Sequence, residues 1–98
     1  MPRETTRFDA AAYLTTAEGV EEFLRSAFED GSPGEIAASL GVVARAHGMS
    51  ELARDTGLSR QALYKALTEE GNAGFGTILK VAHALGFRLV PERIPQQA

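Results

Sequence analysis

Residues 50–67 constrain the fold of this 98-residue chain more than any other segment, because they predict two short helices joined by a glycine turn. Leu52 and Ala53 give the first helix an apolar side, and Gly57 supplies a left-handed corner that only glycine enters cheaply. Ser59 is then placed to cap the second helix. In that helix we expect the inward side to consist of Ala62, Leu63, Ala66 and Leu67.

The opposite side of the second predicted helix is polar. Residues 61, 64, 65 and 68 follow the i, i+3, i+4, i+7 spacing that places side chains on one helix face. A planar amide suits the edge of adenine, and a cation suits guanine or phosphate. We therefore expect a surface that reads DNA, with these candidate residues: Ser59, Arg60, Gln61, Tyr64, Lys65 and Arg54.

Two of these candidates have simpler explanations. Ser59 is better explained as a helix cap than as a DNA contact. For Arg54, an ordinary surface ion pair is an equal alternative. A purely structural helical hairpin, with no role in nucleic-acid binding, is the alternative for the segment as a whole.

The segment resembles the helix-turn-helix of Xre/Cro-type repressors. In that motif a small residue stands four positions before the turn glycine and an aliphatic residue stands six positions after it. Ala53 and Leu63 match these positions. Two helices that cross steeply within a short turn leave no room for a large side chain at the crossing. The resemblance implies a lambda-repressor-like domain.

Helix boundary signals define the remaining elements. Thr15 and Glu18 have the spacing of a capping box, and the apolar stripe that follows ends at Gly31. The run Ser32-Pro33-Gly34-Glu35 repeats the start signal for a helix that should end near residues 45–48. Gly41 inside that helix predicts close packing against another helix, near the predicted pair.

The C-terminal part contains a loop, a last helix and a tail. Phe75, Ile78, Leu79, Ala82 and Leu85 mark the last helix, which should end at Gly86. The tail that follows alternates in polarity and allows a short strand, although one strand cannot satisfy its own backbone groups. Such a strand would pair with the same strand of a second subunit, through these residues: Phe87, Leu89 and Val90.

The predicted fold class is therefore all-α, a five-helix domain with that optional C-terminal strand. Residues 1–14 form an N-terminal extension, and residues 15–98 form the single domain with its tail. One recognition helix gives too little contact for specificity, so we expect a homodimer that reads an inverted-repeat operator in double-stranded DNA.

Composition excludes several other classes. The chain has no cysteine, so no disulfide or thiolate metal site can form, and His47 and His83 do not make a metal site between them. The glycine-rich run 71–76 lacks the Lys-Ser/Thr ending of a phosphate loop. We expect no enzyme activity, no metal and no cofactor. No apolar run approaches the roughly 20 residues that span a bilayer, which predicts a cytoplasmic protein without membrane contact.

The net charge of −3 is unevenly distributed. Residues 1–40 hold three basic against eight acidic residues, whereas residues 41–98 hold seven basic against five acidic residues. This division suits a protein with two unlike partners. The equal alternative is that the acidic residues solvate one amphipathic helix. Phe8 and Tyr13, outside the strong helical periods, are the candidate contacts to a basic protein partner.

Several segments together resemble the addiction-module antidote proteins of the Xre/Cro type. They are Gly48-Met49-Ser50, Gly57-Leu58-Ser59-Arg60, Leu63-Tyr64-Lys65-Ala66-Leu67, Gly71-Asn72, Phe75, Thr77-Ile78-Leu79-Lys80-Val81 and Ala84-Leu85-Gly86-Phe87-Arg88-Leu89. The resemblance extends forward to Phe8 and covers nearly all of the chain. It departs from the family at Glu51, where relatives often carry glutamine, and in the loop that ends at Gly74.

The resemblance implies the antitoxin of a type II toxin–antitoxin module. Such a protein binds a small basic toxin of the RelE/ParE superfamily and also binds the operator of its own genes. A free-standing Cro-type repressor without a toxin is the main alternative, and a pure protein-interaction domain is another.

Overall fold

The computed structural model describes residues 15–95, and its regular secondary structure in that range is entirely helical. The chain forms α2 (Ala17–Asp30), α3 (Pro33–His47), α4 (Met49–Thr56), α5 (Arg60–Ala66) and α6 (Phe75–Ala84). The prediction of an all-α, five-helix fold is confirmed for these residues.

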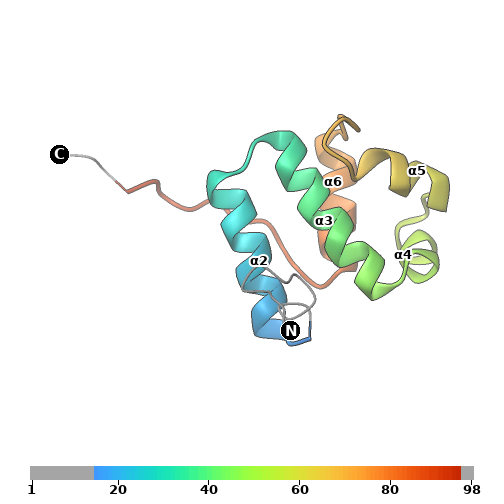
Figure 1. Ribbon diagram of the computed structural model, residues 1–98, viewed down its shortest axis with the longest axis horizontal. Helices are drawn as coiled ribbons and strands as arrows, with labels where there is room; N and C mark the ends of the chain where they lie inside the picture. Colours follow the sequence, from blue (N-terminus) through green and yellow to red (C-terminus); the bar gives the residue numbers. More distant parts are fainter. Residues whose placement is uncertain (1–14, 96–98) are drawn as a thin grey trace, which may run out of the picture.

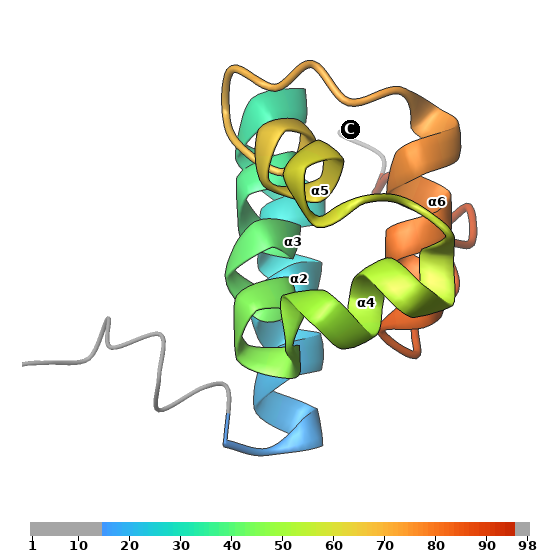
Figure 2. The same cartoon turned by 90° about the vertical axis from the view of Figure 1, so that its right-hand side faces the viewer.

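The longest helices, α2 and α3, lie side by side and run in opposite directions, because only residues 31 and 32 separate them (Figure 1). Helix α6 lies behind α3 in the view of Figure 1, and the two short helices α4 and α5 close one end of the molecule. Seen from that end, α4 and α5 lie in front of the other helices (Figure 2). The segment that the sequence singled out is thus presented at one end of the domain.

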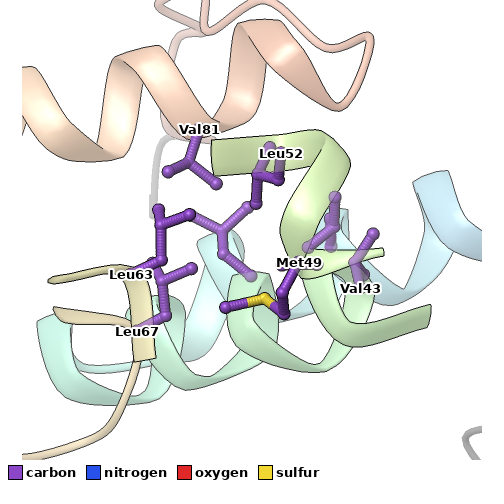
Figure 3. Packing of buried hydrophobic residues seen from close by; sticks show 9 residues of the cluster. Val43, Met49, Leu52, Leu63, Leu67 and Val81 are labelled. Carbon is purple, nitrogen blue, oxygen red and sulfur yellow. The ribbon is translucent and has the colours of Figure 1, made fainter. Parts of the chain in front are cut away.

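The core lies where α3, α4, α5 and α6 meet (Figure 3). Its fully buried large side chains are Leu40, Leu52, Leu63, Leu67 and Val81. Burial of each such side chain contributes about 1.5–3 kcal/mol relative to exposure. Leu63 and Leu67 therefore hold α5 and its C-terminal end against the rest of the domain, and they leave its other side toward solvent.

The start of α3 follows its sequence signals. The Ser32 hydroxyl accepts a hydrogen bond from the backbone N–H of Glu35 at 3.2 Å, and the Glu35 carboxylate accepts one from the Ser32 N–H at 2.8 Å. Pro33 occupies the first helical position, where its missing N–H has no helical partner to lose. The predicted capping box is confirmed.

The start of α2 differs from the prediction by one residue. The cap is Thr16, whose hydroxyl accepts a hydrogen bond from the backbone N–H of Gly19 at 2.9 Å. Because the helix begins at Ala17, its third residue is Gly19 and not Glu18. Glycine has no carboxylate to reach back to the cap, so the box predicted from Thr15 and Glu18 was wrong.

At Gly41, α3 comes very close to the end of α5. A Cβ atom at this position would lie 2.5 Å from the backbone oxygen of Leu67 and 3.3 Å from its Cβ. Only the absence of a side chain permits this contact. The close packing predicted at Gly41 is confirmed, and its partner is Leu67, the residue that directly follows α5.

The C-terminal tail forms no strand within the described range. The Phe87 N–H donates a hydrogen bond to the Ala82 oxygen at 2.8 Å, and the segment then leaves the helical body. A single extended segment needs a second strand to pair with, and residues 15–95 offer none.

Candidate nucleic-acid interface

The turn between α4 and α5 is closed by short-range hydrogen bonds. The Thr56 hydroxyl donates to the Leu52 oxygen at 2.8 Å and accepts from the Leu58 N–H at 3.2 Å. Gly57 caps α4 in the left-handed conformation, with φ of 79°. This conformation is unfavourable for residues that carry a side chain. These bonds fix the direction in which α5 leaves α4.

Ser59 begins α5. Its hydroxyl accepts a hydrogen bond from the backbone N–H of Ala62 at 3.0 Å. This bond satisfies one of the free N–H groups of the first turn. The explanation of Ser59 as a helix cap is therefore confirmed.

The predicted DNA-reading residues all lie on the solvent side of this end of the domain. Each of the six is exposed: Arg54, Ser59, Arg60, Gln61, Tyr64 and Lys65. The Arg60 guanidinium carbon lies 6.0 Å from the centre of the Tyr64 ring, at the outer limit of a cation–π contact. All six side chains are therefore accessible, and Arg60 and Tyr64 lie next to each other on α5.

Ala62 also belongs to this surface, contrary to the prediction that it faces the core. It is exposed, whereas Leu63 next to it is fully buried. Successive residues of a helix are rotated by about 100°, so a helix as short as α5 that buries Leu63 and Leu67 must turn Ala62 outward. A small side chain at this position leaves room for close approach by a partner.

The charge on this surface is mostly uncompensated. Among residues 15–95, Arg60 and Lys65 form no ion pair. Arg54 lies 3.9 Å from the Glu51 carboxylate, and the side chains of the two residues are 71% and 54% exposed, so their attraction is weakened by water. His47 lies at the same distance from the other Glu51 oxygen. Glu51 therefore lies near Arg54, one of the residues predicted to contact DNA.

A groove of about 430 Å³ lies elsewhere on the molecule, between the end of α2, the start of α3 and the loop before α6. Its floor is largely apolar and includes Phe28, Ile36 and Ile78, while Glu69 and Glu70 stand at its edge. Phe75 borders the groove and is 70% exposed.

Sequence reasoning missed this groove because Phe75 fits the apolar period of the last helix. That period does not show that the first turn of α6 extends past the core. The one available signal was the cap residue Gly74 directly before Phe75, which places the aromatic ring in the first turn of its helix.

The other predicted contact residues are placed differently. Phe8 and Tyr13 lie outside the described residues. Phe87 is partly buried and packs against the core, and Leu89 borders the groove. Val90 is 66% exposed.

Residues 15–95 contain no group of three or more His, Cys, Asp or Glu side chains placed to hold a metal ion. No helix in that range is long and apolar enough to cross a membrane.

Fold and surface together define a small helical protein that presents a capped, cation-bearing short helix at one end. The chain belongs to the family described as probable addiction module antidote proteins, whose model matches residues 4–92. It is also 40% identical over 88 residues to a protein of Haemophilus influenzae described as uncharacterized, an alignment that covers 90% of this chain and 91% of that relative. No solved structure matches the chain.

Proposed function

We propose that this protein is the antitoxin of a type II toxin–antitoxin module. In this proposal it neutralises a small basic toxin of the RelE/ParE type in the cytoplasm and, as a dimer, represses its own operator. Membership in the antidote family supports the first activity and does not favour a free-standing repressor. The exposed surface of α5 is the observation that carries the second.

DNA binding is proposed to proceed by entry of α5 into the major groove, as in a helix-turn-helix. Gln61 and Arg60 lie in the first turns of α5, where such a helix contacts base edges. The amide of Gln61 would read adenine, and Arg60 or Lys65 would contact guanine or phosphate. Tyr64 and Arg54 would contact the sugar-phosphate backbone of the DNA.

Toxin binding is proposed to involve the acidic N-terminal half of the chain, including Phe8 and Tyr13. Opposite charge speeds and orients association with a basic protein, and aromatic anchors supply much of the binding energy. The groove with Glu69 and Glu70 at its edge also supports toxin binding, because an apolar floor with an acidic border suits a basic partner.

Co-expression tests the antitoxin activity. The chain is produced together with the product of the adjacent open reading frame, and growth rescue and co-purification are both scored. We expect rescue by the full chain and loss of rescue when residues 1–14 are deleted. Rescue that survives the deletion would remove Phe8 and Tyr13 from the proposed toxin contact.

A salt titration tests the DNA assignment. The probe is the duplex upstream of the chain's own gene, and affinity is measured by fluorescence anisotropy. Gln61→Ala should cost about 1–3 kcal/mol, and loss of Arg60 should also flatten the salt dependence. Lys80→Ala removes an exposed cation from α6 and serves as the control. Unchanged affinity in the Arg60→Ala, Gln61→Ala double variant would contradict the proposed use of α5.

A further inference from the structure

Residues 88–95 form a segment whose backbone is unpaired. Within the described range, the last backbone hydrogen bond of the chain is donated by Phe87, and none involves residues 88–95. Side chains alternate as this segment begins, with Phe87 and Leu89 partly buried and Arg88 and Val90 exposed. Free N–H and C=O groups beside an alternating pattern are a template for pairing with another strand.

The two prolines of the segment leave one edge of it intact. In an extended strand, the N–H groups of successive residues point to opposite edges. Pro91 and Pro95 lack this donor, and both stand at odd positions. The edge formed by Arg88, Val90, Glu92 and Ile94 therefore keeps every donor.

Charge selects one register for pairing this edge with its own copy. A two-fold axis at Val90 places Arg88 opposite Glu92 of the partner subunit, and the symmetry repeats this attraction on the other side. An axis at Arg88 or at Glu92 would place a charge opposite itself. An axis at Pro91 would place Arg88 opposite the partner's Ile94, with no charge match.

We propose that residues 88–92 pair antiparallel with the same residues of a second copy, with the two-fold axis at Val90. This inference rests on the proposed function, in which two copies of α5 read an inverted repeat. The tail leaves the helical body on the side away from α5 (Figure 1), so pairing leaves α5 uncovered in both subunits. It also covers Val90, which is 66% exposed in the single chain.

Charge reversal tests the register in the absence of DNA and toxin. Sedimentation equilibrium of the full chain should show a dimer. Arg88→Glu and Glu92→Arg should each weaken the dimer at least tenfold, because each places like charges opposite one another. The double variant should restore it. Arg93→Glu makes the same charge change outside the proposed pairs and should have little effect.

A cross-link tests the axis itself, since the chain has no cysteine of its own. Directly opposed Cα atoms in a hydrogen-bonded pair lie about 5.5 Å apart, within the range that a disulfide spans. Val90→Cys should therefore form a covalent dimer on mild oxidation. Ile94→Cys, equally accessible at 81% exposed, should not, because the two copies of residue 94 lie at opposite ends of the pairing.

Three results would overturn the proposal. They are a monomeric wild-type chain, a double variant that fails to restore the dimer, and cross-linking of Ile94→Cys as efficiently as Val90→Cys. Each concerns subunit pairing alone. Failure of the strand-pairing proposal can therefore be distinguished from failure of toxin neutralisation.

Discussion

The two connections that flank α5 are built in different ways. The connection from α4 is short and is closed by the caps Gly57 and Ser59 and by the Thr56 hydroxyl. The connection to α6 is longer, contains Asn72 at φ of 53°, and ends at Gly74 without a side-chain cap. What holds its start is the burial of Leu67 against Gly41.

This difference shows how a helix of only seven residues is kept in place. Helices this short are not stable alone in water. Local hydrogen bonds set the direction of α5 at its beginning, and tertiary packing fixes its end. The proposed DNA contacts lie near the locally fixed beginning.

The largest effect on stability is expected at the C-terminal end of α5, which is held by packing. Leu67→Ala should lower the free energy of unfolding by about 2–5 kcal/mol, because the side chain is 1% exposed and its removal leaves a cavity. Urea denaturation measures this. Glu69→Ala, two residues further on and exposed, should stay within about 0.5 kcal/mol of wild type. Equal effects of the two changes would show that packing does not fix this end.

At the capped end, two substitutions separate stability from DNA binding. Ser59→Ala removes the bond to the Ala62 N–H and should cost about 0.5–2 kcal/mol of stability. Ser59→Asp keeps a capping oxygen, so its melting temperature should stay close to that of wild type. Its added negative charge should nevertheless weaken DNA binding, as measured by anisotropy. If Ser59→Asp binds DNA with normal affinity, the phosphate backbone of the DNA does not pass close to residue 59.

A smaller effect, on DNA affinity, is expected from replacing Glu51, which lies near Arg54. Glu51→Gln removes the carboxylate that lies 3.9 Å from the Arg54 guanidinium. DNA affinity should increase by about 1 kcal/mol or less, because the pair is exposed and screened. Glu69→Gln makes the same change at the other connection and should leave DNA affinity unaltered. An equal gain in both variants would indicate a general charge effect and no local contact.

The smallest effect concerns the uncapped start of α6. Gly74 has φ of −72°, and a Cβ atom there would meet nothing within 4 Å, so serine fits without strain. Gly74→Ser should raise stability by a few tenths of a kcal/mol through a new cap bond. Gly74→Ala adds a side chain without an acceptor and should not stabilise the fold. A melting curve distinguishes the two variants.

Local chain chemistry made much of the fold predictable. The capping box of Ser32 and Glu35, the corner at Gly57, the cap Ser59 and the close contact at Gly41 are each properties of a few neighbouring residues. Such features depend little on the rest of the molecule.

The errors share a different cause. Ala62 was expected to face the core and is exposed, because a period identifies a helix face without showing how far the core extends along it. Phe75, which correctly marked the start of α6, is exposed for the same reason. The groove beside Phe75 is formed mainly by residues 28–37 together with residues 69–78, which are distant in sequence, so no local pattern predicts it. The candidate DNA-contact residues came from the sequence alone, whereas their exposure among residues 15–95 became visible only in the fold.

Leu63 and Leu67 are the only fully buried large side chains that anchor α5 and its end. Of the other positions of this helix, Ala66 is half-buried and the rest are exposed. Under the proposed function, genetic drift at those positions would change which promoter is recognised while the domain still folds. Duplicated modules within one genome could in this way become insulated from each other's regulation.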